Sequence, residues 1–300
     1  MNDIYVKESN SPYIFTLPHS GEKLIREMDW QLTPEAKKFL PNVDWHLNEL
    51  YGFLEKYNVN IVSTPHSRYV VDVNRPADAE PFGNYRRSLV YSTNTWDEEI
   101  YAIPPSEEDV QRRINRYYKP FHDELEALVT KKVQEFGKVY LIDLHSFMGP
   151  ITEEVCLGNR HNVTCSEAFL EKVYSAFDAE GFETVRNKVF IGGYISKSYA
   201  VKDVVEALQI ELRYTNYIEP EDLDIRQAPR KKTNLFEETA ARLEKVFKKV
   251  GIEKLTTIQE VFSANKNEKL TVDTNKLKSN KLFWFIALGL ALVLGVLEKW

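Results

Sequence analysis

Short apolar stretches alternate with longer amphipathic stretches over the first 262 residues of the chain. The short stretches are rich in β-branched and aromatic residues and are bounded by proline, glycine or polar residues, as is typical of buried strands. We predict strands at 13–17, 59–64, 69–73, 138–144, 188–194 and 206–212. Strands that alternate with helices indicate an α/β fold, here with a mixed, largely parallel central sheet.

The stretches between these strands carry apolar residues at helical spacing. Ser106 starts a Ser-x-x-Asp capping pattern, and the segment 106–137 ends at a glycine. We expect Pro120 to break or kink this segment, because proline lacks the amide hydrogen that a helix interior needs. We predict helices at 46–57, 106–137 in two parts, 164–181 and 234–251.

The stretch after residue 262 differs from the rest of the chain. Residues 263–281 are polar and rich in lysine and asparagine, and residues 282–297 form an unbroken apolar run. As a helix this run would be about 24 Å long, which is short for a hydrocarbon core of about 30 Å. Flanking lysines and tryptophans nevertheless favour a membrane over a buried or oligomerisation helix. We predict a folded domain at 1–262, a linker at 263–281 and a membrane-associated C-terminal tail at 282–300.

Composition limits the partners and the cellular compartment that suit this protein. The chain has 300 residues, a net charge of −6 and 43% hydrophobic residues, which is enough for a large core. The acidic balance argues against a nucleic-acid partner, although a few local arginines would suffice for a small anionic substrate. The two cysteines lack the spacing of a zinc site or a disulfide framework, and no secretory signal is visible. We therefore expect a cytoplasmic protein, with the C-terminal tail as a membrane anchor facing the cytosol.

Several predicted strands end at residues that suit metal chemistry. The carboxyl ends of parallel strands are where ligands bind in α/β sheets. His19 and Glu22 form a His-x-x-Glu pair that could place a nitrogen and a carboxylate oxygen on one divalent cation, with His145 as a third ligand from a distant strand. Asp143 precedes His145 by two residues and could orient its imidazole from the same face of the strand.

Two further strand ends suit substrate binding and proton transfer. Asn74 and Arg75 follow an apolar stretch, and an arginine beside an amide suits recognition of a carboxylate. Glu211 lies between Ile210 and Leu212, and burial there would raise its pKa toward neutrality, which suits a general base. Taken singly, each motif has an ordinary alternative as a surface or turn residue. Their convergence at strand ends favours a hydrolytic site.

The motifs lie in longer blocks, among them "LPHSGE", "SRYVVDVNRP", "LIDLHSF", "CLGNRHNVTCS", "FIGGYISKSYA" and "ALQIELR". In type and order, across roughly residues 13–250, these blocks resemble the N-formylglutamate amidohydrolases, a family related to zinc carboxypeptidases. The resemblance implies a three-layer α/β/α fold of the phosphorylase/hydrolase type. It also implies an amidohydrolase that cleaves N-formyl-L-glutamate to formate and L-glutamate in histidine degradation, with one divalent metal, Zn²⁺ by preference.

The resemblance also implies roles for individual residues. His19 and His145 would be metal ligands, and the carboxylate ligand stays open between Glu22 and Asp44. Glu211 would be the general base. Asn74 and Arg75 would hold the substrate carboxylate, Arg68 would stabilise the oxyanion, and Gly193 and Tyr194 would line the pocket in a tight loop.

Two other histidines, His66 and His122, are expected near the site without being metal ligands. Two other functions stay open. One is a related deacylase or carboxypeptidase that acts on another N-acyl amino acid or peptide. The other is a catalytically inactive, membrane-tethered binding protein of the same fold.

Overall fold

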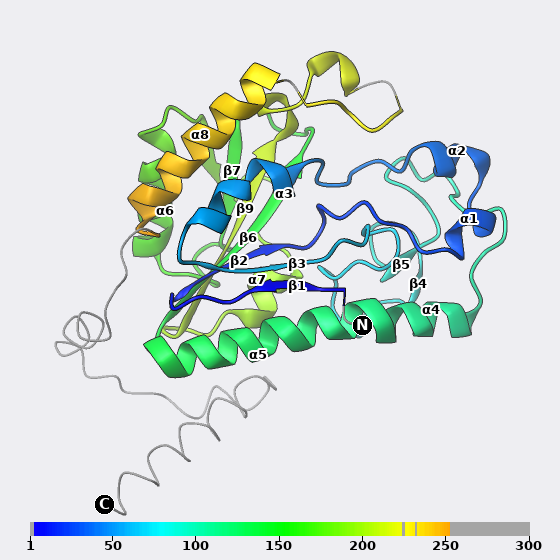
Figure 1. The fold of residues 1–300 in the computed structure, drawn as a ribbon, viewed down its shortest axis with the longest axis horizontal. Helices are drawn as coiled ribbons and strands as arrows, with labels where there is room; N and C mark the ends of the chain where they lie inside the picture. Colours follow the sequence, from blue (N-terminus) through cyan, green and yellow to red (C-terminus); the bar gives the residue numbers. More distant parts are fainter. Residues whose placement is uncertain (1–2, 224–225, 232, 253–300) are drawn as a thin grey trace, which may run out of the picture.

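A mixed seven-stranded sheet forms the centre of the computed structural model, which describes residues 3–223, 226–231 and 233–252 (Figure 1). The strand order is β1-β3-β2-β6-β9-β7-β8. Strands β3, β2, β6 and β9 are mutually parallel, while β1 and β7 run antiparallel to their neighbours β3 and β9. The strands are β1 (Tyr5–Lys7), β2 (Tyr13–Leu17), β3 (Asn60–Ser63), β6 (Val139–Phe147), β7 (Val155–Gly158), β8 (Thr184–Arg186) and β9 (Val205–Arg213). A separate pair is formed by β4 (Phe82–Gly83) and β5 (Val90–Tyr91).

Helices cover both faces of this sheet, which confirms the expected three-layer arrangement (Figure 1). The α-helices are α1 (Met28–Gln31), α2 (Pro34–Lys38), α3 (Leu47–Leu50), α4 (Glu107–Arg113), α5 (Lys119–Phe136), α6 (Glu167–Asp178), α7 (Tyr194–Tyr199) and α8 (Thr233–Val250). Short 3₁₀ turns η1 (Gly52–Lys56), η3 (Tyr214–Asn216) and η4 (Pro220–Asp222) and a π-helical turn η2 (Ile114–Tyr118) complete the secondary structure. Helices α6 and α8 pack on one face, and α5 and α7 pack on the other.

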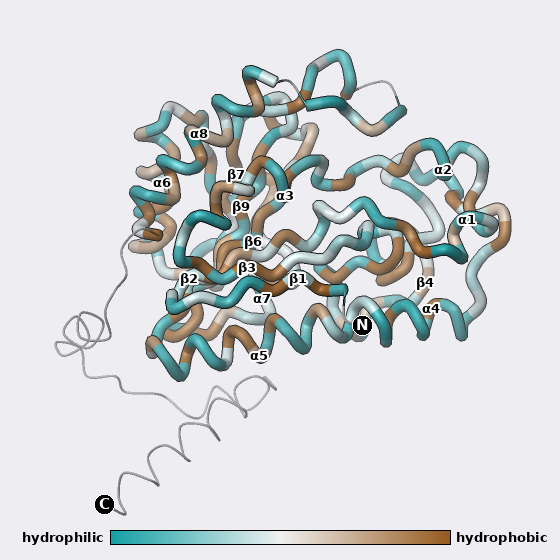
Figure 2. The backbone as a smooth tube through the Cα atoms, in the orientation of Figure 1, coloured by the Kyte–Doolittle hydropathy of each residue, from teal (hydrophilic) through white to brown (hydrophobic). Residues whose placement is uncertain are grey.

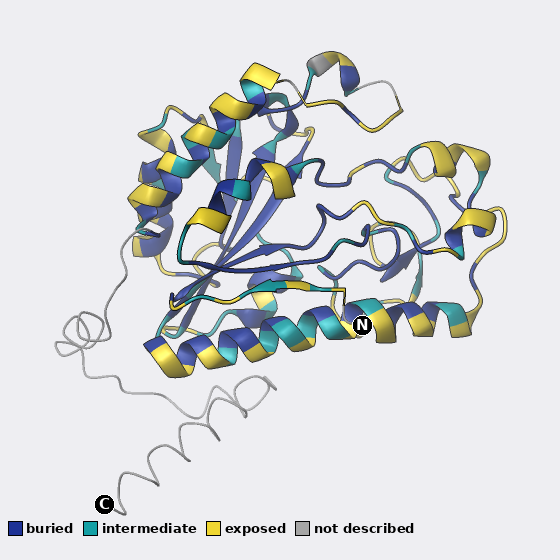
Figure 3. Ribbon diagram, viewed as in Figure 1, coloured by how far each residue is buried: buried dark blue, intermediate teal, exposed yellow. Residues whose placement is uncertain are grey.

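Alternation along the strands supplies two separate cores, because successive side chains of a strand point to opposite faces. In β2, Phe15 makes an edge-on contact with Phe247 of α8, at 5.1 Å between ring centroids. Its neighbour Ile14 belongs to the other core, together with Leu125 and Val129 of α5. Figure 2 shows the apolar stripe along α5, and Figure 3 shows that the buried residues of this helix face the sheet.

Most predicted elements are confirmed. The strands predicted at 13–17, 59–64, 138–144 and 206–212 correspond to β2, β3, β6 and β9, and the helices at 164–181 and 234–251 to α6 and α8. The helix predicted at 46–57 is split into α3 and a 3₁₀ turn. The linker and tail predicted at 263–300 lie outside the described residues. Among the residues that the structure describes, no helix combines the length and apolar character needed to cross a membrane.

Two strand predictions were wrong. The segment 69–73 is buried but forms no strand, because its backbone bonds lie outside the sheet, as from the N–H of Asp72 to the carbonyl of Leu89. Residues 188–193 form a loop that leads into α7, whose first residue is Tyr194. The segment 106–137, in contrast, has two α-helical parts as predicted, namely α4 and α5, which the π-helical turn η2 joins in one helical path (Figure 1). Pro120 lies in the first turn of α5, where its missing amide hydrogen is tolerated.

Candidate metal centre

A cavity of about 460 Å³ opens at the carboxyl ends of β2, β6 and β9. Parallel strands end together at this edge, so loops from distant parts of the chain meet there. The lining residues are His19, Asn42, Asp44, Arg68, Asp72, Asn74, Arg75, Tyr85, His145, Ser146, Phe147, Met148, Gly149, Pro150, Phe190, Gly193, Gln209 and Glu211.

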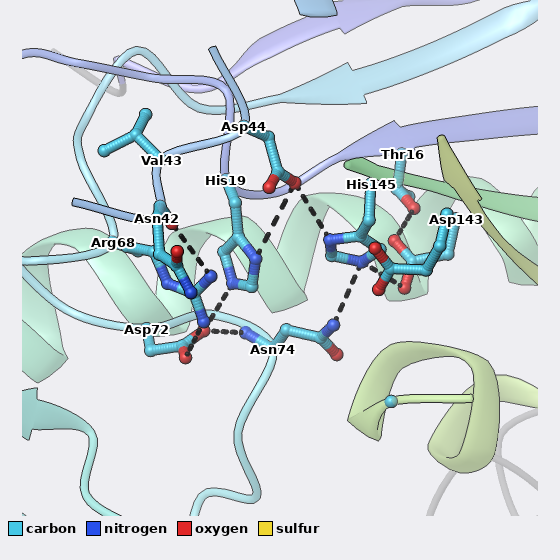
Figure 4. A network of polar contacts seen from close by, with 12 residues as sticks. Thr16, His19, Asn42, Val43, Asp44, Arg68, Asp72, Asn74, Asp143 and His145 are labelled. Carbon is cyan, nitrogen blue, oxygen red and sulfur yellow. Dashed lines mark hydrogen bonds and ion pairs between the residues drawn. The ribbon is translucent and has the colours of Figure 1, made fainter. Parts of the chain in front are cut away.

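Three buried side chains of this cavity form a group that could hold a metal ion (Figure 4). His19 lies two residues beyond the end of β2, His145 lies near the end of β6, and Asp44 lies in the loop before α3. The Oδ2 atom of Asp44 is 3.0 Å from Nδ1 of His145 and 4.0 Å from Nδ1 of His19. The backbone N–H of Asp44 donates to the carbonyl of His19 at 3.1 Å, which fixes the loop to the strand end.

The structure places Glu22 outside this group. Glu22 is exposed and borders a different surface pocket, beside Leu24 and Lys37. The chain turns away from the cavity at Gly21, where a Cβ atom would lie only 2.4 Å from the carbonyl oxygen of Thr64. The prediction of Glu22 as the metal ligand was therefore wrong in its geometry, and Asp44 occupies the position that a carboxylate ligand would need.

Each histidine is oriented through its second ring nitrogen. Nε2 of His19 is 2.6 Å from Oδ1 of Asp72, and Nε2 of His145 is 3.0 Å from Oδ2 of Asp143. Thr16 donates in turn to Asp143 at 2.6 Å. A carboxylate behind a histidine fixes the ring and strengthens its other nitrogen as a metal ligand. Both Nδ1 atoms are therefore directed toward Asp44.

The charges around the two histidines favour a cation at this place. Burial lowers the pKa of His19, and the positive charge of Arg68 lowers it further, which favours the neutral imidazole that metals require. Burial opposes a charge on His145 as well, but Asp143 and Asp44 raise the pKa of His145 well above its ordinary value. The negative charges of these carboxylates therefore favour a positive charge between the Nδ1 atoms, which a divalent metal would supply.

Asp72 connects the histidines to the arginines of the cavity. It accepts hydrogen bonds from Nη2 of Arg68 at 3.1 Å and from the backbone N–H of Asn74 at 2.8 Å, and Nε of Arg75 lies 3.3 Å away. Burial would raise the pKa of Asp72, but the hydrogen bond with His19 and the positive charge of Arg68 hold it well below its ordinary value. No role was assigned to Asp72 from the sequence, although it lies in one of the blocks that resemble the family. The signal available was a single acid within the apolar block "YVVDVNRP".

Glu211 lies beside the metal group. It stands opposite His145 in the parallel pairing of β6 with β9, and it is buried. Nε2 of Gln209 donates to its Oε1 at 2.8 Å. Burial raises the pKa of Glu211 to about 8, and Asp44 raises it as well. A carboxyl group with such a pKa can accept and return a proton near neutral pH.

The residues predicted to bind substrate lie partly in the cavity. Arg68 and Arg75 line it, and Arg75 donates to the carbonyl of Tyr85 at 2.9 Å. Asn74 also lines it, with Nδ2 at 3.1 Å from Nε2 of His145 (Figure 4). Gly193 is in contact with Asn74, since a Cβ atom there would lie 2.6 Å from Nδ2.

Tyr194 and two histidines lie outside the cavity lining. The ring of Tyr194 faces His122, at 5.7 Å between centroids. Nε2 of His122 is 2.9 Å from the carbonyl of Val73, so this histidine supports the segment that carries Asp72. His66 packs against Tyr117, with ring centroids 4.4 Å apart, and does not reach the metal group.

The fold and this site define an α/β protein with a candidate hydrolytic metal centre at the carboxyl edge of its sheet. A sequence profile of the family described as N-formylglutamate amidohydrolase matches residues 11–218. The chain therefore belongs to the N-formylglutamate amidohydrolase family.

Known proteins agree with this assignment. An N-formylglutamate deformylase of Pseudomonas aeruginosa is 30% identical over 227 residues, which cover 71% of this chain and 84% of that protein. A deformylase of Pseudomonas putida is 28% identical over 69% of this chain and 82% of its own length. The crystal structure of N-formylglutamate amidohydrolase from Ralstonia eutropha superposes with a TM-score of 0.68 at 22% identity, covering 84% of this chain and 99% of that one. This structural similarity shows that the two proteins share a fold.

Proposed function

We propose that this protein hydrolyses N-formyl-L-glutamate to formate and L-glutamate, with a divalent metal held by His19, Asp44 and His145. The observation that supports this proposal best is the meeting of these three ligand atoms with Glu211 in one cavity. The identity of the substrate is proposed from the relatives named N-formylglutamate deformylase. We also propose that the reaction belongs to histidine degradation, as the family resemblance of the sequence implies.

The donor set fits the proposed metal. Two imidazole nitrogens and one carboxylate oxygen are a common ligand set of catalytic zinc sites, where a fourth position stays open. Zinc is therefore our first choice among the divalent ions that such donors bind. When bound, a divalent metal would lower the pKa of a coordinated water and polarise a carbonyl group.

Glu211 is the proposed general base and acid. Its carboxylate takes a proton from water as the water oxygen attacks the formyl carbon, and a tetrahedral oxyanion forms. The C–N bond then breaks, and Glu211 returns the proton to the leaving amine nitrogen. Formate and the free amino acid result, so the proton that Glu211 takes is the proton it gives back.

Arg68 is proposed to stabilise the oxyanion. Its guanidinium is held by the carbonyl of Asn42 at 3.2 Å, by Asp72 at 3.1 Å and by the ring of Tyr85, which lies 5.1 Å away. A cation fixed in this way needs no rearrangement when negative charge develops, and such preorganisation is a large part of catalysis.

Asn74 and Arg75 are proposed to hold a substrate carboxylate. The amide of Asn74 is oriented, because its Oδ1 accepts from the backbone N–H of Ile195 at 2.8 Å. Arg75 is partly exposed to the cavity and keeps donors for an anion beyond its bond to Tyr85. Gly193 completes this wall of the cavity.

The test uses the full-length chain and measures formate release. We expect hydrolysis of N-formyl-L-glutamate, loss of activity with a chelator, and recovery on addition of zinc. N-acetyl- and N-succinyl-glutamate and N-formyl derivatives of other amino acids complete the panel. A clear preference for one of these substrates would instead indicate a related deacylase. A metal content below about one-tenth of an equivalent, together with no activity, would contradict hydrolysis altogether.

A further inference from the structure

Gln209 is a buried polar residue that the proposed reaction leaves without a task. It lies on β9 two residues before Glu211, so both side chains point to the same face of the sheet. It is only 5% exposed and lines the cavity. A buried amide that faces an active site needs partners for both of its ends, and the identity of those partners indicates what it does.

The orientation of this amide follows from its neighbours. One end meets the backbone N–H of Gly193, which can only donate, so the atom facing it is Oε1 of Gln209. The other end, Nε2, must then face Glu211, and it donates to Oε1 of that carboxylate at 2.8 Å. The amide cannot be turned round without placing two donors together at Gly193 and two acceptors together at Glu211.

This contact distinguishes the two oxygens of Glu211. Oε1 already accepts from Gln209, whereas no hydrogen bond within the described residues occupies Oε2. A carboxylate held through one oxygen can exchange a proton at the other without rotating. We propose that Gln209 is a positioning residue, which fixes the Glu211 carboxylate so that Oε2 is the oxygen that exchanges the proton. This inference rests on the proposed hydrolytic role of Glu211.

The same amide also reaches the substrate wall of the cavity. Gly193 lies against Asn74, which in turn accepts a hydrogen bond from Ile195 in the first turn of α7. The bond between Gly193 and Gln209 therefore holds the loop before α7 against β9. Through this contact Gln209 connects the proposed base with the proposed carboxylate-binding residue. Because Gln209 contacts Glu211 directly and Asn74 only through Gly193, loss of Gln209 should affect substrate binding less than proton transfer.

Two substitutions separate these contacts. Gln209→Met keeps the length of the side chain and removes both hydrogen bonds. Gln209→Glu keeps the acceptor toward Gly193 and, at alkaline pH where it is ionised, replaces the donor toward Glu211 with a repelling oxygen. Gln31→Met is the matched control, because Gln31 is equally buried and accepts from Arg113, far from the cavity.

The experiment measures kcat, KM, metal content and thermal unfolding of each full-length variant with N-formyl-L-glutamate. We expect Gln209→Met to lower kcat by about 10- to 100-fold, as is usual when a supporting partner of a site is lost, with a smaller rise in KM and an unchanged metal content. Gln209→Glu should lower kcat as strongly at alkaline pH. Gln31→Met should keep the kcat of the wild type, whatever it does to unfolding.

Two results would overturn the inference. In the first, Gln209→Met keeps kcat within about twofold of the wild type, or loses it only in proportion to lost metal or lost folded protein. In the second, Gln209→Glu keeps full kcat at alkaline pH, which would show that only the bond to Gly193 matters. Absence of hydrolysis in the wild type would instead refute the proposed function.

Discussion

Replacing Glu211 with glutamine should remove activity and, in the metal-free protein, increase stability. Glutamine has the same shape and can still accept from Gln209 through its amide oxygen, so the packing is kept. It cannot take a proton from water, and loss of a general base typically costs about 10²–10⁴ in rate. Formate release should fall by that factor while the metal content stays unchanged.

The stability gain follows from the pKa. Burial raises the pKa of Glu211 from an ordinary value of 4.5 to about 8 in the folded state. The folded protein therefore binds the proton more tightly than the unfolded chain, and wild-type stability falls as the pH rises through this interval. At ~1.36 kcal/mol per pKa unit, the cost reaches roughly 3 kcal/mol at pH 7 and at most roughly 5 kcal/mol above pH 8. Glu211→Gln avoids this cost.

Urea unfolding between about pH 5 and pH 9, with a chelator present, measures the difference. The advantage of Glu211→Gln should be small at the acidic end, widen as the pH rises and level off near pH 8. Adding the metal should narrow it, because a nearby cation stabilises the ionised carboxylate. Glu22→Gln serves as the control, since this exposed glutamate should leave both assays unchanged. A constant or reversed difference would refute the reasoning from burial, and retention of more than about a tenth of the activity would refute the role as base.

Three further substitutions test the rest of the site. Asp44→Asn should lower the metal affinity by at least about 10-fold in a competition titration, and equal affinity would exclude Asp44 as a ligand. Asp72→Asn should lower metal affinity by about 10- to 100-fold and the free energy of unfolding in urea by about 3–5 kcal/mol, because two arginines and His19 lose a buried anion. An unchanged unfolding curve would contradict the role of Asp72 as their buried partner. Arg75→Met should raise KM for N-formyl-L-glutamate by about 10- to 100-fold with a smaller change in kcat, since it removes a charge-assisted hydrogen bond; an unchanged KM would place the substrate carboxylate elsewhere.

The sheet and three site residues could be predicted because they follow a regular pattern. Strands β2, β6 and β9 are apolar runs with clear ends, and His19, His145 and Glu211 lie at or near those ends. Strand periodicity also predicts that Asp143 shares a face with His145, and the structure has the two side chains in contact. Local pattern is sufficient wherever the position of a residue depends on the strand that carries it.

Asp44 could not be placed with the same certainty, because its position depends on contacts between distant segments. Spacing alone favours Glu22, only three residues after His19. The close contact of Gly21 with the carbonyl of Thr64 directs the chain away from the cavity, and the loop before α3 brings Asp44 in. Neither event has a periodic signature, so the choice between the two carboxylates required the structure.

The incorrect strand at 69–73 and the missed acid Asp72 have one common cause. The segment does alternate as a strand would, because Val71 and Val73 are buried in the core beside α5 while Asp72 between them lines the cavity. Its backbone, however, is bound by the carbonyl of Leu89 and by His122 rather than by a neighbouring strand. Apolar alternation reports which side chains are buried and not what their backbone pairs with. A single acid within such a buried run needs hydrogen-bonding or charged partners, and here those partners are the proposed metal ligand His19 and the two arginines of the cavity.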